Sequence, residues 1–192
     1  MQIQYQFNVD KAIAAMVVFL RRLGPMDKLK LIKLLYLADR DCFLKDGHPI
    51  TGDTPVAMDH GPVPSACLDV LNGDIPSQAF SFLHVRDTEV SLDPNPPSTP
   101  TEPFTAEEAS VLEQTLQKYG SLTTSELYRL VHQLPEYKDA YVPGTSTPIP
   151  FAKILQHYGN EEQFRHGRPV ITRQMRRHLV CPFTQPEPAL DA

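Results

Sequence analysis

Apolar residues recur at steps of three and four between Asp27 and Gly47, and this spacing predicts an α-helix. The apolar stripe is so wide that we expect the helix to be packed on several sides, at the centre of the domain. Asp27 is the expected N-cap, because its carboxylate can accept from the N–H groups of the first turn, and Gly47 is the expected end. Only a narrow charged ridge, formed by Lys30, Lys33 and Arg40, is predicted to stay in water.

The same spacing predicts further helices on both sides of the central one. These are expected over residues 9–23, 65–71, 105–120, 123–131 and 149–158. Thr105 with Glu108, and Thr123 with Glu126, have the spacing of a capping box, in which each side chain bonds an N–H group that the helix leaves without a partner. Ser65 is the expected cap of the helix over 65–71.

Two stretches with strand-like composition, 80–85 and 89–92, flank the turn residues 86–88 and predict an antiparallel hairpin. Together with residues 56–58 the hairpin is expected to form one small sheet beside the helices. The predicted fold class is therefore α+β and predominantly helical, with a central buried helix in a helical bundle and a small antiparallel β-sheet or hairpin.

Length and composition place the chain among ordinary globular proteins. It has 192 residues, of which 41% are hydrophobic and 21% charged, so we expect one domain over residues 1–160. A basic C-terminal segment with a proline-rich tail follows over 161–192. The net charge of −5 argues against a nucleic-acid partner, because general nucleic-acid binders are normally basic.

The cysteines and the apolar stretches indicate a cytoplasmic protein. Cys42, Cys67 and Cys181 are widely spaced and include no C-x-x-C pair, which fits a reducing compartment better than a disulfide or zinc site. The longest apolar stretch is too short to cross a bilayer, so we expect no membrane contact. Residues 1–5 lack a basic region followed by an apolar core, and we expect no signal peptide.

The seven histidines are the first candidates for chemistry, but their spacing predicts neither a metal site nor a cofactor site. The sequence also lacks the motifs of common hydrolases, so we expect no enzyme activity and no catalytic residues. His60, before the Gly61-Pro62 turn, and His132, near a helix end, are interpreted as structural residues that hydrogen-bond backbone carbonyls. Asp53 is likewise interpreted as a turn former. The alternative is a small hydrolase that uses His60, His132 and Asp53.

Two regions are predicted to contact a partner. One is the basic segment, whose cations are Arg165, Arg168, Arg173, Arg176 and Arg177. These arginines are either a solvated face, a nucleic-acid contact or a docking surface for the carboxylates of a protein. The other is the stretch with Phe80 and Phe82. If this stretch is a strand at a sheet edge, its backbone could pair with a strand from a partner. The alternative is that these aromatic side chains are buried in the hydrophobic core.

Several segments together resemble a known family. They are residues 31–40, 49–53, 60–63, 130–139 and 148–155, and their order and spacing resemble the Panacea (SocA-like) antitoxin domain of bacteria and phages. The resemblance runs from about Lys11 to Gly159. Tyr137 departs from the family, which usually has Trp there, but both residues are aromatic anchors.

The resemblance implies an antitoxin that binds and neutralises a co-encoded toxin protein. An alternative within protein binding is a proteolytic adaptor that delivers the toxin to a AAA+ protease, as some relatives of the SocA type do. The resemblance also implies that residues 1–160 are a stable scaffold whose surface is adapted to one partner.

Overall fold

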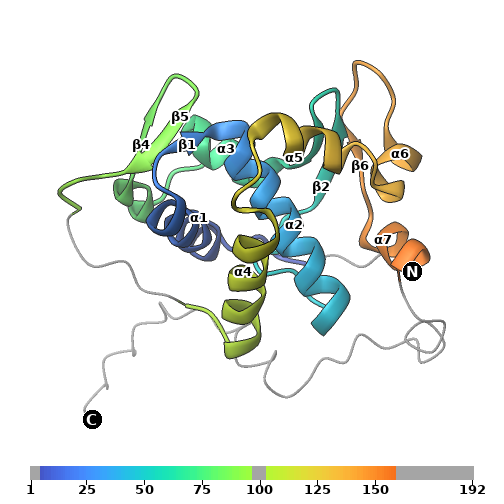
Figure 1. Cartoon of the computed structure of the whole chain (residues 1–192), viewed down its shortest axis with the longest axis horizontal. Helices are drawn as coiled ribbons and strands as arrows, with labels where there is room; N and C mark the ends of the chain where they lie inside the picture. Colours follow the sequence, from blue (N-terminus) through green and yellow to red (C-terminus); the bar gives the residue numbers. More distant parts are fainter. Residues whose placement is uncertain (1–4, 97–102, 159–192) are drawn as a thin grey trace, which may run out of the picture. The chain divides into compact units, whose positions relative to one another are not determined.

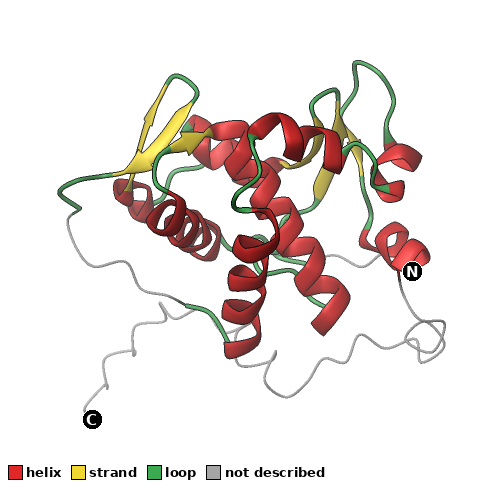
Figure 2. Ribbon diagram, in the orientation of Figure 1, coloured by secondary structure: helices red, strands yellow, loops and turns green. Residues whose placement is uncertain are grey.

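The computed structural model describes residues 5–96 and 103–158, which belong to one compact unit. The α-helices of these residues are α1 Val9–Leu23, α2 Lys28–Asp46, α3 Ser65–Asn72, α4 Ala106–Tyr119, α5 Thr124–Val131, α6 Pro135–Ala140 and α7 Phe151–Tyr158. The strands are β1 Met26–Asp27, β2 Pro55–Met58, β3 Gly61–Pro64, β4 Leu83–Arg86, β5 Glu89–Leu92 and β6 Thr147–Pro148, and a 3-10 helix, η1, covers Gln78–Phe82. The predicted class is confirmed (Figure 2).

The central position predicted for α2 is also confirmed. The helix runs through the middle of the described unit (Figure 1), where it packs against α1, α4, α5 and α7. Every residue from Leu31 to Arg40 is buried. The Asp27 carboxylate accepts from the N–H of Leu29 at 2.8 Å, and the helix ends at Gly47, whose φ of 78° is left-handed. Full burial of one leucine side chain contributes roughly 2 kcal/mol, so this helix contributes much of the core stability.

The prediction that the charged ridge of α2 stays in water is wrong. Lys33 is 0% exposed and Arg40 is 8% exposed, whereas Lys30 is half-buried. The reason is that other elements cover α2 between Leu31 and Arg40, where Pro62 and Glu136 supply polar partners for Lys33 and Arg40.

The strands form two separate three-stranded antiparallel sheets, with the orders β1-β5-β4 and β3-β2-β6. The prediction of one joint sheet is therefore wrong. β2 pairs with its own hairpin partner β3 and with β6, in the register Val56 opposite Val63 and Pro148. β5 pairs with β1 through Val90 and Met26, on the other side of α2 in Figure 1.

The hairpin predicted around residues 86–88 is confirmed, but its first strand is shorter than expected. β4 begins at Leu83, and residues 78–82 are a 3-10 helix instead of a strand. The Ser77 hydroxyl accepts from the N–H of Ala79 at 3.1 Å and thereby starts a helical turn. Phe80 and Phe82 are half-buried and pack against the core.

Caps define the other helices. Both predicted capping boxes are present, with the Glu108 and Glu126 side chains accepting from the N–H groups of Thr105 and Thr123 at 2.9 and 2.8 Å. The prediction for Ser65 is wrong, since Pro64 is the N-cap of α3 and makes no side-chain cap.

No helix among residues 5–96 and 103–158 is long and apolar enough to cross a membrane.

Candidate functional site

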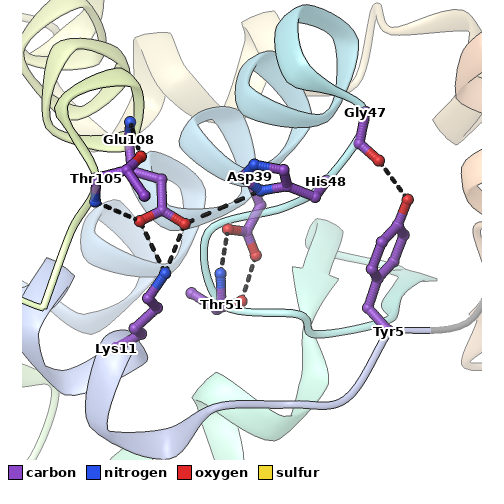
Figure 3. Close-up of polar contacts among 8 residues, drawn as sticks. All are labelled: Tyr5, Lys11, Asp39, Gly47, His48, Thr51, Thr105 and Glu108. Carbon is purple, nitrogen blue, oxygen red and sulfur yellow. Dashed lines mark hydrogen bonds and ion pairs between the residues drawn. The ribbon is translucent and has the colours of Figure 1, made fainter. Parts of the chain in front are cut away.

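Residues 47–64, here called the α2 loop, follow the central helix and contain two of the predicted motif segments. Buried side chains of α2 hold this loop in place. The Asp39 carboxylate accepts from both the N–H group, at 2.9 Å, and the hydroxyl of Thr51 (Figure 3). At the far end of the loop, the Lys33 ammonium donates to the carbonyl of Pro62 at 2.8 Å. The loop is therefore attached to the helix at two points.

Burial dominates the electrostatics of Asp39. The loss of water raises its pKa to about 7, although the two bonds from Thr51 act in the opposite direction and the nearby Asp53 adds a smaller increase. A protonated carboxyl can donate to the Thr51 hydroxyl, so both protonation states keep a hydrogen bond to the loop.

Lys33 lies beneath the turn between β2 and β3, where burial lowers its pKa to about 7. Gly61 allows the loop to approach this closely. It has φ of 92°, and an added Cβ would come within 3.0 Å of the His132 and Val131 side chains and 3.2 Å of the Lys33 ammonium. The predicted motif glycine is thus required by both conformation and space.

Asp53 caps α3 from a distance. Its carboxylate accepts from the N–H of Cys67, in the first turn of that helix, at 2.8 Å, where a negative charge is favourable. Burial nevertheless raises the pKa of this carboxyl. Its structural role explains why α3 needs no cap from Ser65.

A second buried acid joins α1, α4 and the α2 loop (Figure 3). Glu108 is 2% exposed, and its carboxylate accepts from the Lys11 ammonium at 2.6 and 2.7 Å. His48 of the α2 loop places Nδ1 3.9 Å from the same carboxylate. Nearby, the Tyr5 hydroxyl donates to the Gly47 carbonyl at 2.5 Å, so the segment before α1 also holds the end of α2.

A third buried acid, Glu136, connects α6 to α2. It is 0% exposed and accepts from Arg40 Nε at 2.6 Å and from the Tyr36 hydroxyl at 3.0 Å. Burial acts to lower the pKa of Arg40, but the charge and hydrogen bond of Glu136 outweigh it and hold that pKa above its usual value. The Arg40 guanidinium also lies 4.1 Å from the centre of the Tyr158 ring.

The ring of His132 lies between two backbone carbonyl groups. Its Nδ1 lies 2.6 Å from the Tyr128 carbonyl and its Nε2 3.3 Å from the Asp59 carbonyl, so the ring joins α5 to the turn between β2 and β3. Tyr137 is the predicted aromatic anchor. It is 3% exposed, and its hydroxyl donates to the Met58 carbonyl at 3.0 Å.

His60 differs from its prediction. The side chain is exposed, makes no hydrogen bond within the described residues, and has its ring 6.5 Å from the ring of Tyr128. Asp53 lines a small cavity of about 10 Å³ whose lining includes neither His60 nor His132. The three residues of the hydrolase alternative therefore do not form one cavity.

The partner surfaces predicted from the sequence have different outcomes. The five arginines from Arg165 to Arg177 lie outside the described residues, so their role stays a prediction. Phe80 and Phe82 are not in a strand, but Phe80 lines an open groove beside β4.

Among the described residues, no group of three or more His, Cys, Asp or Glu side chains is placed to hold a metal ion.

The family comparison agrees with the segments over 31–40, 49–53 and 60–63 and with most of 130–139, whereas 148–155 lies beyond the end of the match. A family model described as "Antitoxin SocA-like, Panacea domain" matches residues 31–138, which are more than half of the chain. The match includes the α2 loop and most of the helices that hold it. Neither the curated proteins nor the solved structures contain a match to the chain.

Proposed function

Because the chain belongs to the family of SocA-like antitoxins with a Panacea domain, we propose that it neutralises a co-encoded toxin by binding the toxin protein directly. The match over residues 31–138 carries this proposal. Family membership indicates an antitoxin role in general, and direct binding is the mechanism that we infer for this chain. We place this activity in the cytoplasm.

The buried polar contacts support a role in binding. A protein that recognises one partner gains affinity if its surface is ordered before the partner arrives, because ordering loops on binding lowers the affinity. Here Asp39, Lys33 and Glu136 connect the α2 loop and α6 to the central helix. The surface above them is therefore held in one shape by side chains that are themselves buried.

The contacts that we propose for the toxin include the predicted ones. The five arginines at positions 165, 168, 173, 176 and 177 would pair with carboxylates of the toxin, since the planar guanidinium suits bidentate recognition. Phe80 and Phe82 would add apolar contact next to the groove beside β4. In most interfaces a few such anchors supply most of the affinity.

The test is expression of the neighbouring open reading frame with and without this chain. We expect the neighbour alone to stop growth, and the pair to grow and to copurify as a complex. A matched control is the variant Leu34→Asp, which places a carboxylate in the core, since Leu34 is 0% exposed. This variant should fail to fold and to rescue growth. A harmless neighbour, or rescue without a complex, would contradict the proposal.

The same strains separate direct blocking from the adaptor alternative. If the chain blocks the toxin, the amount of toxin per cell stays constant while growth recovers. If the chain delivers the toxin to a AAA+ protease, the toxin disappears, and deletion of the protease restores both toxin and growth arrest. An immunoblot of the toxin over time distinguishes the two.

A further inference from the structure

The strand β4 is the outer strand of its sheet, because the order is β1-β5-β4. An open groove of about 480 Å³ lies beside it. The groove has an apolar part formed by Leu71 of α3, Phe80 of η1 and the β4 residues Leu83 and Val85, with Lys28 and His84 at its polar part. One side of β4 is thus paired with β5 and the other is next to a groove.

The register shows which backbone groups point toward the groove side. Leu83 lies opposite Leu92 and Val85 opposite Val90, while the N–H of Asp93 donates to the carbonyl of Phe82 at 2.9 Å. Hydrogen-bonding direction alternates along an antiparallel strand. Phe82, His84 and Arg86 therefore direct their groups to β5, and Leu83 and Val85 direct theirs away from it.

Three of these outward groups have no partner within the described residues. The N–H of Leu83 donates to the Phe80 carbonyl, which leaves the Leu83 carbonyl and both backbone groups of Val85. Such groups on an outer strand form a template for another extended segment. A residue opposite Val85 could exchange two hydrogen bonds with it, and a residue two positions along could donate to Leu83.

We propose that an extended segment of the toxin adds to β4 as a further antiparallel strand, an inference that rests on the proposed antitoxin function. Side chains opposite Val85 and Leu83 would lie on the same face as these residues and enter the groove. That face is apolar, so the segment has apolar residues at these two alternate positions.

Charge complementarity fixes the remaining chemistry of the segment. Arg86 is exposed on the opposite face of β4, and the Lys28 ammonium lies next to the groove, where it donates to Asn72 at 3.1 Å. The position opposite Arg86 on the added strand would favour a residue with a carboxylate side chain, because opposite charges on neighbouring strands attract. The partner is therefore a strand that alternates acidic or polar residues with apolar ones.

The test compares Val85→Pro with Val85→Thr in the full chain. Proline removes the outward N–H and blocks the approach of a strand, and it leaves the bonds between β4 and β5 in place. Threonine keeps the N–H and the branched shape. With the neighbouring toxin as the probe, we expect the Kd of Val85→Pro to rise roughly tenfold or more, while Val85→Thr binds within about threefold of the unaltered chain.

A second measurement follows hydrogen exchange of the Val85 amide in the unaltered chain. We expect fast exchange in the chain alone and slow exchange in the complex. If the unaltered chain forms no complex, the antitoxin proposal fails. If it forms a complex and Val85→Pro binds as tightly, only the β4 proposal fails.

Two other occupants would also overturn the proposal. Slow exchange in the chain alone, together with a dimer that Val85→Pro converts to a monomer, would show that a second copy occupies the edge. Slow exchange in a chain that is monomeric throughout would show that another segment of the same chain does so.

Discussion

Buried side chains of α2 bond the backbone of the α2 loop at Thr51 and Pro62, and Asp53 of the loop in turn bonds the N–H of Cys67 in α3. At β4, by contrast, the outward backbone groups of Val85 have no partner within the described residues. Both regions lie next to the core, and both are built from short strands and turns. They differ in whether the polar groups are satisfied inside the protein.

This difference indicates that the α2 loop maintains the shape of the protein, whereas the edge of β4 is available to recognise a partner. Unpaired polar groups are costly when buried, so the α2 loop needs Asp39, Lys33 and Asp53 to keep its position. At the surface the same groups are hydrated and remain available to a partner. We therefore expect substitutions in the first region to change stability, and substitutions at the β4 edge to change binding.

The largest effect on stability is expected from Glu136→Ala. This change leaves Arg40 and Tyr36 buried without their common acceptor, and loss of one partner of a buried ion pair typically costs about 3–5 kcal/mol. Because Arg40 also bonds Asp41 at 2.9 Å, we expect the lower end, about 3 kcal/mol. The free energy of unfolding in urea measures it.

Glu113→Ala is the matched control, since it removes an acid from an exposed ion pair. Glu113 lies 2.9 Å from Arg22, and the two side chains are 41% and 60% exposed. Exposed pairs contribute little, so we expect a loss below about 0.5 kcal/mol. Equal losses in the two variants would show that burial of Glu136 does not strengthen its contribution.

The next effect is a pH dependence that Asp39→Asn should remove. The unfolded carboxyl ionises near pH 4, while in the folded protein the pKa is about 7. Between these values the folded state holds more protons, so the free energy of unfolding falls as the pH rises from about 4 to about 7. The slope of the free energy of unfolding against pH cannot exceed about 1.36 kcal/mol per pH unit for this one group.

Asparagine is close in shape and can keep both bonds to Thr51, with its oxygen accepting from the N–H and its amide donating to the hydroxyl. The difference in unfolding free energy between the unaltered chain and Asp39→Asn should therefore fall over this pH range. Urea titrations at pH 4, 5.5 and 7 provide the measurement. A constant difference would mean that Asp39 is already ionised in the fold at pH 4.

The central helix and the capped helices were predictable because their signals are local. Asp27, Gly47 and the two capping boxes lie within a few residues of the helix ends that they define. The burial of Lys33 and Arg40 was missed, although the signal was present: a helix that is apolar on nearly every side leaves no face for its charges. Glu108 and Glu136 were not predicted as buried partners of Lys11 and Arg40 because these contacts join residues about a hundred positions apart.

The strands illustrate a different limit. Phe80 and Phe82 alternate with a polar residue as strand residues do, but the Ser77 hydroxyl starts a helical turn before them, and the first strand begins only at Leu83. The pairing of β5 with β1, and of β2 with β6, depends on where the helices place these strands. Such pairings have no signature within the strand itself.

The last stability comparison is between the two sides of β4. His84→Pro removes an N–H that points to β5, and we expect a loss of about 2 kcal/mol because the acceptor on β5 is left without its donor. Val85→Pro removes an N–H that points outward, so it should cost less than about 1 kcal/mol. Thermal and urea unfolding of both variants give the two values. If both prolines cost the same, the alternation inferred from the Phe82 to Asp93 bond is wrong, and the outward groups of Val85 are not what a toxin strand would meet.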